Sequence, residues 1–490
     1  MPELERPTDV YDRVVEWDDL SRFAARGGPG LAVGVVYGRR RQGKSYLLRR
    51  LAAATGGFYY QALEEEPAPA LERLASTLGG WLDVPGGRLA FEDWSAAVSA
   101  IADLGRGRDR PVVVVLDEFP YLLDRVPELA SLLQRVVDAS RDQSAGSVRL
   151  VLCGSALSVM TELLSGQRAL RGRVATTVAI EPFDFRNAAA YWGLADNWEV
   201  AVRLHAILGG TPGYRDLLGL DPPRRVSDLG RWLAAGVCNP ASAMFREDDY
   251  LLAEQRGLTD RALYHSVLSA VAMGNHTETK MAAVLGRERQ ALSWPLKVLV
   301  DAGFVTRDED ALRERRPTYR IAEPIVRFHH VVTRADLARF EERRAAEAWA
   351  DAAERFSSHV LGPHFEDLAR QWTARYASAG TTGGALARVG ATQVNDPAGR
   401  SHYELDVVGV GRQGQVSLIG EAKFRSQRPG AEALSRLDRL RELLASRARL
   451  APIVKLAVFS GTGFSPALVR EAADRADVEL IDLERLYAGE

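Results

Sequence analysis

A phosphate-binding loop is the strongest chemical signal in this sequence. Gly38, Gly43, Lys44 and Ser45 satisfy the pattern G-x-x-x-x-G-K-[ST], between a strand-like apolar run and the helix-like run SYLLRRLAAA. The glycines let backbone N–H groups surround a triphosphate, and the helix that follows offers the positive end of its dipole. Lys44 is expected to reach the β- and γ-phosphates, and the Ser45 hydroxyl to ligate Mg²⁺. The alternative, a Gly/Lys-rich surface turn, does not account for the strand and helix on either side.

The whole loop is therefore predicted to bind ATP. Its candidate contact residues are Gly38, Arg39, Arg40, Arg41, Gln42, Gly43, Lys44 and Ser45.

Two acidic residues follow the second strand-like run, PVVVVLDEF. Such a β-branched run is typical of a strand that is buried on both faces of a parallel sheet, and ligands bind at the carboxyl ends of such strands. We expect Asp117 to hold Mg²⁺ through water and Glu118 to orient and activate the attacking water. An acidic strand end alone is a weak signal, but the upstream phosphate loop makes it strong.

Two polar residues farther along are candidates for contact with the γ-phosphate. Ser155 ends the apolar run VRLVLCGS and is predicted to be a sensor of that phosphate, or alternatively the cap of the next helix. Arg173, which follows Arg171 in ALRGRV, is a candidate arginine finger that stabilises charge in the transition state. The alternative for Arg173 is a solvated surface arginine.

The order of these segments resembles the AAA-related STAND group of prokaryotic ATPases, and within it the "archaeal ATPase" family. The resemblance rests on YGRRRQGKS, VVLDEFPYLL, VLCGSALSVM, LRGR, EPFDF and GGTPGYRDLL. It implies a P-loop ATPase with a helical lid and a winged-helix domain. It also implies that the G-x-P motif at 210–212, with Pro212, contacts the adenine side of the nucleotide. The family's F-x-x-R-x-x-E segment is matched only in part, by Tyr11, Arg13 and Glu16.

Composition indicates a globular protein with several domains. The 490 residues are 46% hydrophobic and 26% charged, with a net charge of −2, so nucleic-acid binding would need a local basic patch. The run of about 18 apolar residues that spans a membrane is absent, and so is the apolar core of a signal peptide. The two cysteines, Cys153 and Cys238, form neither a disulfide framework nor a metal cluster. A cytoplasmic location without membrane contact is expected.

Helical patterns dominate the middle of the chain. Residues 187–257 fit a helical lid, and 258–335 fit a winged helix in which three helical runs precede a hairpin ending in TYRI. The recognition region carries Arg287, Arg289, Trp294 and Lys297, with Pro295 expected to interrupt the helix early. These residues suit DNA contacts. The alternative is that the module packs against the ATPase core, because the wing also carries acidic residues.

A second constellation lies near the C-terminus, beyond an expected helical connector at 336–358. Two strands, HYELDVVGV and QVSLIGEAKF, are separated by the turn GRQG. The period of two places Glu404 with Asp406 on one strand, and Glu421 with Lys423 on the next. Asp406 and Glu421 are expected to hold Mg²⁺ at a scissile phosphate, while Lys423 positions or deprotonates water and offsets charge. Glu366, in HFEDLARQW, is a further metal-side candidate.

This arrangement resembles the PD-(D/E)xK nuclease superfamily, and the "archaeal ATPase" family carries such a domain at its C-terminus. A surface hairpin with ordinary cross-strand ion pairs is the alternative. Arginines follow on the next helix and could line a nucleic-acid backbone, although interleaved acids favour i,i+4 pairs. These arginines are Arg425, Arg428, Arg436, Arg439 and Arg441.

The predicted fold is α/β: a P-loop parallel-sheet ATPase core, a helical lid, a winged helix and a C-terminal α/β domain like restriction endonucleases. The predicted boundaries are 1–186, 187–257, 258–335, 336–358 (connector) and 359–490. The predicted function is an ATP-hydrolysing switch, with ATP and Mg²⁺ as cofactors, that controls a nuclease-like effector. The expected partners are nucleic acid, DNA before RNA, a further protein, and copies of the same chain when ATP binds. The alternative is a nucleotide-gated regulator whose C-terminal domain binds without cleaving.

Overall fold

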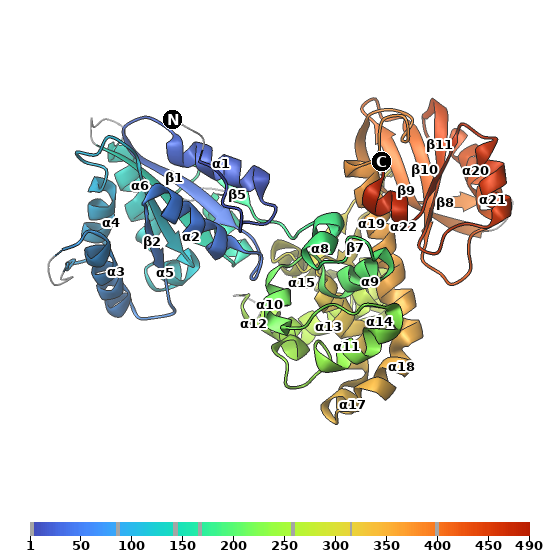
Figure 1. Cartoon of the computed structure of the whole chain (residues 1–490), viewed down its shortest axis with the longest axis horizontal. Coiled ribbons are helices and arrows are strands. Elements are labelled where there is room, and N and C mark those ends of the chain that lie inside the picture. The colour runs from blue at the N-terminus through green and yellow to red at the C-terminus, as the bar shows by residue number, and fades with distance from the viewer. Residues whose placement is uncertain are drawn as a thin grey trace. The chain divides into compact units, whose positions relative to one another are not determined.

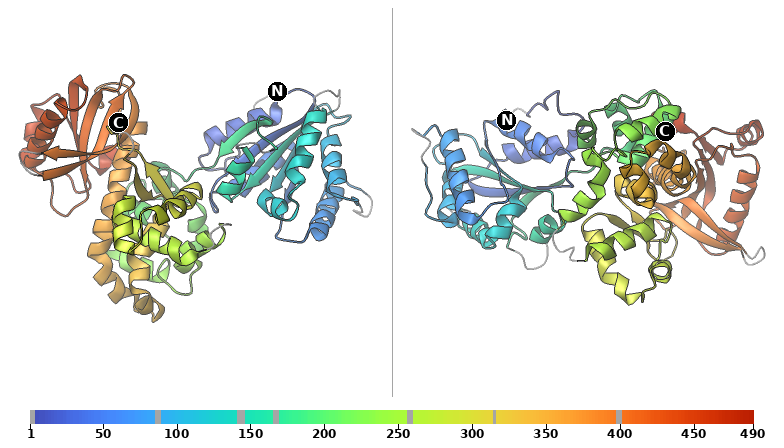
Figure 2. Two further views of the ribbon diagram at one scale, coloured as in Figure 1. Left: turned by 180° about the vertical axis from the view of Figure 1, so that it is seen from behind. Right: turned by 90° about the horizontal axis from the view of Figure 1, so that it is seen from below.

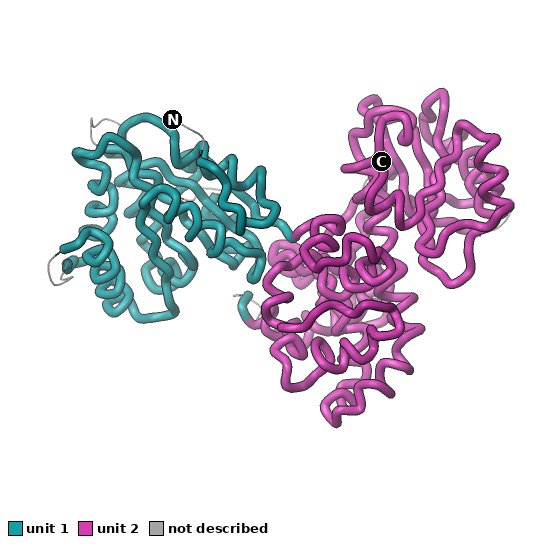
Figure 3. Tube along the Cα trace, in the orientation of Figure 1, with its two compact units in different colours: residues 1–182, 254–256 teal, residues 183–253, 257–490 magenta. Residues whose placement is uncertain are grey.

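The computed structural model describes residues 4–84, 89–140, 146–164, 169–255, 260–313, 316–396 and 401–490. These residues divide into two units (Figure 3). Unit 1 contains residues 1–182 with 254–256, and unit 2 contains residues 183–253 and 257–490. The predicted α/β class is confirmed, and the hairpin, the C-terminal segments and most of the predicted lid lie in unit 2, whereas residues 254–256 near the end of that lid belong to unit 1.

Unit 1 is built on a parallel five-stranded sheet with the order β2-β3-β4-β1-β5, which confirms the predicted parallel core (Figure 1). The strands are β1 (Gly30–Tyr37), β2 (Phe58–Gln61), β3 (Val112–Asp117), β4 (Ser147–Gly154) and β5 (Val174–Ala179). β4 lies between β1 and β3, so the carboxyl ends of the strands that carry the phosphate loop and the Asp-Glu pair flank the end of β4.

Helices cover both faces of this sheet (Figure 2). They are α1 (Val14–Ala25), α2 (Lys44–Thr55), α3 (Pro67–Trp81), α4 (Trp94–Asp103), α5 (Phe119–Arg125), α6 (Leu129–Ser140) and α7 (Leu157–Leu164). The period of two in β3 explains the two layers, because alternate valines enter different clusters. Val113 and Val115 pack with α1 and α2, whereas Val112 and Val114 pack with α3 to α6.

The first part of unit 2 is helical and includes an antiparallel hairpin. Its helices are α8 (Phe185–Tyr191), α9 (Trp198–Leu208), α10 (Gly213–Leu218), α11 (Leu229–Ala235), α12 (Glu247–Ala253), α13 (Arg261–Ala272), α14 (Glu278–Leu285) and α15 (Gln290–Asp301). The hairpin, called the wing below, consists of β6 (Val305–Asp308), β7 (Thr318–Ile321) and the described residues between them. The expected interruption at Pro295 is absent: α15 continues through it, because Pro295 is buried in the sixth helical position and removes only one backbone hydrogen bond.

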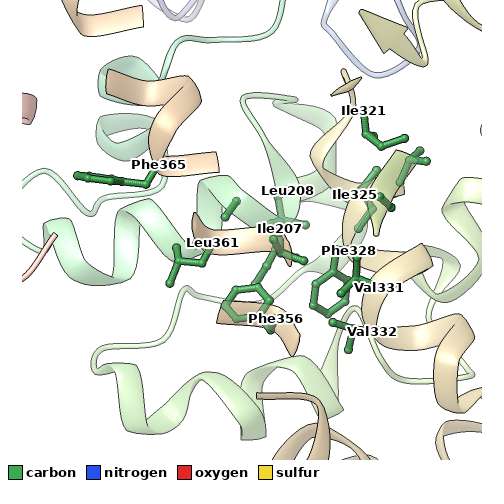
Figure 4. Packing of buried hydrophobic residues seen from close by; sticks show 14 of the residues in the cluster. Ile207, Leu208, Ile321, Ile325, Phe328, Val331, Val332, Phe356, Leu361 and Phe365 are labelled. Atoms are coloured by element: carbon green, nitrogen blue, oxygen red, sulfur yellow. The ribbon is translucent and has the colours of Figure 1, made fainter. Parts of the chain in front are cut away.

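The segment at 336–358 is not a connector but part of the core of unit 2. The chain continues through α16 (Pro324–Phe328), a π-helical turn (His329–Thr333), α17 (Leu337–Glu341), α18 (Ala345–Phe356), a second π-helical turn (Ser357–Leu361) and α19 (Gly362–Arg375). Ala348, Ala352 and Phe356 are buried, since the alanines of α18 form one helical stripe. Figure 4 shows Phe356 beside Phe328 and Ile207, in a cluster shared with α9 and α16.

The C-terminal part of unit 2 is a mixed five-stranded sheet with the order β12-β11-β10-β9-β8. Its elements are β8 (Leu386–Asp396), β9 (Ser401–Gly411), β10 (Val416–Lys423), α20 (Glu432–Ala445), β11 (Leu450–Ser460), α21 (Pro466–Ala473), β12 (Val478–Ile481) and α22 (Leu483–Ala488). β8, β9 and β10 are antiparallel, and β10, β11 and β12 are parallel. α19 packs on one face and α20 on the other. Among the described residues, no helix combines the length and the hydropathy that a membrane crossing requires.

We expect unit 2 to lose stability in mild acid while unit 1 does not. All eight histidines of the chain lie between residues 205 and 402. Burial lowers the pKa of His205 and of His276 to about 4, and that of His330 to about 3. The unfolded chain therefore binds more protons than the folded chain below pH of about 6.5, so stability is present above that pH and falls towards about pH 4.

Hydrogen exchange followed by mass spectrometry at pH 7.5 and pH 5, corrected for intrinsic rates, measures this difference segment by segment. The result expected is a loss of protection in α9, α13 and α19 with β1 and β4 as the internal reference. An equal loss in both units would contradict the role of the buried histidines.

Candidate active sites

The phosphate loop connects β1 to α2 at the carboxyl edge of the unit 1 sheet. Gly38 is required by space, because a Cβ there would lie 2.3 Å from the Ile180 carbonyl oxygen. Gly43 is required by conformation, since its φ of 87° is in the left-handed region that side chains disfavour. Steric space thus requires glycine at position 38, and backbone conformation requires it at position 43.

Lys44 starts α2 and lies back across the loop. Its ammonium is buried and donates to the Arg39 carbonyl oxygen at 2.8 Å. Burial lowers the pKa of Lys44, whereas Cys153, Glu118 and Asp117 oppose that shift. The cation therefore faces the acidic end of β3 as well as the loop.

The acidic pair is held by a network at the end of β3. The Tyr59 hydroxyl donates to Asp117 Oδ2 at 2.6 Å, and the Glu118 N–H donates to Asp117 Oδ1 at 2.9 Å. Glu118 has a left-handed backbone (φ 53°), an uncommon state that is typical of functional turns. Its Oε2 accepts from the Ser155 hydroxyl at 3.2 Å, and burial, then Asp117, raises the pKa of Glu118. The structure thus brings Lys44, Asp117, Glu118 and Ser155 to one edge of the sheet.

The other loop residues have unequal surroundings. Gln42 is buried, Arg39 and Arg41 are half-buried, and Arg40 is exposed. Arg41 has a left-handed φ of 65°, and Ser45 lies half-buried in the first turn of α2. The loop is therefore bent at two places, Arg41 and Gly43.

The structure does not bring Arg173 to this edge. Arg173 precedes β5, whose first residue pairs with Val33 in the middle of β1, five residues before Gly38 begins the loop. Its guanidinium forms a bidentate ion pair with Asp138 near the end of α6, with Nη2 at 2.8 Å from Oδ2. Strand register and the Asp138 pair hold this side chain away from the loop of its own chain, so the arginine-finger role stays a prediction that would need a neighbouring copy. Pro212, expected at the adenine side of the nucleotide, precedes α10 in unit 2, and its role stays a prediction.

Arg13 is the residue of this site whose contact the sequence did not reveal. Its Nη2 donates to the Gln42 carbonyl oxygen at 3.1 Å, and its Nη1 pairs with Glu16 at 2.9 Å. Asp12 and Arg13 are consecutive left-handed residues, a bend that turns the guanidinium towards the loop. The sequence indicated Arg13 only as part of a partly matched family segment, whereas the structure ties it to the backbone of the phosphate loop.

Replacing Arg13 with Ala is expected to weaken ATP binding by about 10-fold or more, because a charged hydrogen bond to a buried carbonyl contributes about 1.5–3 kcal/mol. The turnover number should change much less, since Arg13 acts through the loop. Titration with a fluorescent ATP analogue and steady-state kinetics separate the two effects. Arg22→Ala, an exposed arginine on α1 paired with Asp19, is the matched control. Unchanged affinity in Arg13→Ala would refute the positioning role.

Comparison with known proteins agrees with this geometry. Residues 10–202 match the sequence profile of a family described as an ATPase domain predominantly from Archaea. This part of the chain is similar to the ATPase domains of that family. An uncharacterized protein of Methanocaldococcus jannaschii is 27% identical over 312 residues, which are 63% of this chain and only 65% of that relative.

Solved structures that resemble this chain share little sequence with it. A Walker-type ATPase of Pyrococcus abyssi has a TM-score of 0.49 and 20% identity over 67% of this chain and 98% of the other. The ORC2 protein of Aeropyrum pernix, in its ADPNP–ADP complexes, has a TM-score of 0.40 and 16% identity over 71% and 97% of the two chains.

The C-terminal sheet of unit 2 carries the second cluster. Lys423 Nζ donates to Asp406 Oδ2 at 3.0 Å and lies 3.5 Å from Glu421 Oε1. The Ala422 N–H donates to the same Asp406 oxygen at 2.9 Å. Burial alone would lower the pKa of Lys423, but the charges of Asp406 and Glu421 raise it, so this lysine is an ammonium at neutral pH. The structure therefore favours charge compensation and water positioning over deprotonation by Lys423.

A β-bulge places Asp406 within this cluster. Gly390 of β8 pairs with Val408, and Thr392 pairs with Leu405, so Ala391 faces both Asp406 and Val407. The extra residue disturbs the alternation of side chains between the two faces of the sheet. Leu405 and Val408 both pack on the α20 face, although residues three apart in a regular strand point to opposite faces. The simple period of two therefore fails between Leu405 and Val408, and the Asp406 carboxylate accepts from the backbone of β10 while it still interacts with Glu404.

Two further carboxyl groups lie near Asp406. Burial and the charge of Asp406 raise the pKa of Glu366 on α19 to about 7, and the same causes, in the same order, raise the pKa of Glu404. Arg370, one turn after Glu366, donates to the Asp406 carbonyl oxygen at 2.7 Å. α19 thus brings a second acid and a cation to the opposite side of the cluster from α20.

The predicted i,i+4 pairs on α20 are mostly replaced by pairs between elements. Arg436 pairs with Glu421, and Arg439 pairs with Asp396 at 2.6 Å. Arg441 pairs with Asp477, just before β12, and with Asp438 one turn away on α20. These arginines hold the domain together instead of forming a free cationic row.

The candidate recognition helix keeps an exposed face. Trp294 is 66% exposed, and the Lys297 ammonium lies 5.8 Å from its ring centroid. Arg289 pairs with Glu278 at 2.8 Å, so it is not free for a phosphate. The wing contacts the C-terminal sheet, since the Ala311 N–H donates to the Ala391 carbonyl oxygen at 2.9 Å.

Proposed function

We propose that this protein is an ATP-driven switch that controls magnesium-dependent cleavage of nucleic acid by its C-terminal domain. One observation carries the nuclease half: a lysine ammonium contacts two carboxylates at a β-bulge, with a third acid on α19. This set, Asp406, Glu421, Lys423 and Glu366, has the chemical groups that phosphodiester hydrolysis needs.

The donor set fits Mg²⁺, which prefers carboxylate oxygens. Asp406 and Glu421 would hold the ion, with Glu366 as a further acid, and the ion would polarise the scissile phosphate. Lys423 would position the water whose oxygen attacks phosphorus and would offset the charge that develops there. The bond from phosphorus to the leaving sugar oxygen breaks, and the proton of the water passes to a neighbouring carboxylate or to solvent.

The ATPase half uses the edge of the unit 1 sheet. Lys44 would bind the β- and γ-phosphates, and Glu118 would orient the attacking water. Mg²⁺ would be held by the Ser45 hydroxyl and, through water, by Asp117, which suits a hard cation. Ser155, which already contacts Glu118, would report the presence of the γ-phosphate to that base.

A regulator that binds nucleic acid without cutting it is the second candidate. The observation that favours it is the pairing of Glu421 with Arg436 as well as with Lys423. Both cations compete with a metal ion for the same carboxylate, so a closed state of this kind would bind Mg²⁺ poorly.

The partners proposed are DNA before RNA, a further protein, and copies of this chain. The exposed Trp294 and Lys297 on α15 support DNA contact by the winged-helix module. Assembly on ATP binding is proposed because a STAND-type switch couples nucleotide state to association; an arginine from a neighbouring copy, such as Arg173, would then act in trans. Size-exclusion chromatography with and without ATP tests this, and an unchanged elution volume would refute it.

The decisive experiment is a nuclease assay on the purified chain. Labelled single- and double-stranded DNA and RNA are incubated with Mg²⁺ or Mn²⁺, with and without ATP. Metal-dependent cleavage that changes with ATP is the result expected. Intact ATP hydrolysis without cleavage under any condition would refute the nuclease and favour the regulator.

A further inference from the structure

A chamber of about 980 Å³ lies inside unit 2, between the wing and β8. Its walls come from the start of α14, both wing strands, α19 and β8, and they include Glu366, Glu404 and Arg370 of the cluster described above. A second cavity, of about 310 Å³, is lined by Lys423 and Arg425. Ser358, Pro363 and Glu366 line both cavities, so the chamber leads to the proposed cleavage site.

The chamber lining has more cationic than acidic side chains, with eight arginines and six acidic residues. Three of these acids are paired, Glu278 with Arg289, Asp308 with Arg320, and Glu309 with Arg307, whereas Asp310, Glu366 and Glu404 form no ion pair among the described residues. Three of the lining arginines likewise form no ion pair within the part of the chain that the structure describes. These are Arg313, Arg316 and Arg388. Arginines without acidic partners in a concave wall are suited to phosphate groups.

The wing covers one side of the chamber and is hydrogen-bonded to β8. Besides the Ala311–Ala391 hydrogen bond, the Thr392 hydroxyl donates to Asp310 Oδ1 at 2.7 Å. Ala311 is 3% exposed and packs with Val394 and Leu405 in the core of the sheet. The roof is therefore part of the folded domain, so a ligand must fit beneath it.

The partial cover over this chamber favours one class of nucleic acid. A chamber of about 980 Å³ that the wing covers on one side leaves little room for the two paired strands of a duplex, whose grooves alone are about 6 Å and about 12 Å wide. A single strand fits, since its backbone and splayed bases thread a groove without a partner strand. We propose that the chamber receives single-stranded nucleic acid, whose phosphates bind Arg313, Arg316 and Arg388, and delivers it to Asp406.

This inference rests on the proposed nuclease function but is tested by binding alone. A labelled single strand of about 20 nucleotides, longer than a site of about 4–16 nucleotides, is titrated with the full chain in EDTA, as DNA and as RNA. The same sequence is used as a blunt duplex, and the readout is fluorescence anisotropy. We expect single strands to bind at least about 10-fold more tightly than the duplex.

The triple variant Arg313→Ala, Arg316→Ala, Arg388→Ala should weaken single-strand binding by about 10-fold or more and reduce the salt slope by about 2, since each phosphate contact adds about 0.7. Lysine at the same three positions should restore most of the affinity. The control is Arg224→Ala, Arg225→Ala, Arg412→Ala, which removes equal charge at exposed positions outside the chamber. Thermal unfolding checks that each variant is folded.

Binding and cleavage experiments separate an error in the chamber assignment from an error in the nuclease assignment. Tight duplex binding, or single-strand binding that the triple variant leaves unchanged, would overturn the chamber assignment even if the protein cuts DNA. Selective single-strand binding that depends on these arginines would support it even if no cleavage were found.

Discussion

Lys44→Ala is expected to reduce ATP hydrolysis by about 100-fold or more. The ammonium of Lys44 is buried and points to the Arg39 carbonyl oxygen, at the centre of the loop that would surround the triphosphate. Its removal takes away the cation that would face the transferring phosphoryl group, and loss of one such preorganised group costs about 10²–10³ in turnover. Steady-state release of phosphate measures the effect.

Arginine at position 44 is not expected to support ATP hydrolysis. The chain has five lysines among its 63 basic side chains, so arginine serves nearly everywhere that a positive charge alone is needed. At Lys44 the cation is buried in a narrow loop, where a compact ammonium fits and a planar guanidinium does not. Lys44→Arg should therefore be as inactive as Lys44→Ala. Arg50→Ala, an exposed cation on the same helix, is the control and should keep normal turnover. Normal hydrolysis in Lys44→Ala would refute the assignment of the loop.

Local sequence predicted the elements that carry the chemistry. The run LAVGVVYG followed by GKS indicates a buried strand and a helix start, and VVVVLDE indicates a central strand that ends in acids. Both are local patterns, and the structure has β1, α2 and β3 at these places. The order of the sheet then brings Ser155 beside Glu118, because β4 lies between β1 and β3.

Features that depend on distant partners could not be predicted in this way. The bulge at Asp406 exists only because β8 pairs with β9 in two registers, and β8 has no strong strand pattern of its own. The contact of Arg13 with Gln42 spans 29 residues, and the Arg173–Asp138 pair spans 35. Likewise, the burial of α18 depends on α11, whose Gly230 lies against Trp349. Predicting any of these contacts requires knowledge of which helices and strands are neighbours in space.

Asp406→Asn is expected to abolish metal-dependent cleavage, by about 100-fold or more, while ATP hydrolysis continues at the normal rate. The change keeps the shape of the side chain, so the hydrogen-bonding position beside Ala422 is preserved. It removes the charge that would bind Mg²⁺ and that raises the pKa of Lys423. ATP hydrolysis is spared because the phosphate loop and its acids belong to unit 1. Gel analysis of labelled strands and a phosphate-release assay on the same preparation measure both activities.

Asp477→Asn is the matched control, since Asp477 pairs with Arg441 and Arg475 in the same sheet but lies outside the cluster. It should cleave normally, and this separates loss of chemistry from loss of stability. If Asp406→Asn cleaves as well as the wild type, the cluster is not the catalytic centre. If the wild type hydrolyses ATP but cuts nothing, the ion pair of Glu421 with Arg436 explains why the cluster binds no metal ion. The Glu421 carboxylate would then stabilise the folded domain, and the domain would bind nucleic acid without cleaving it.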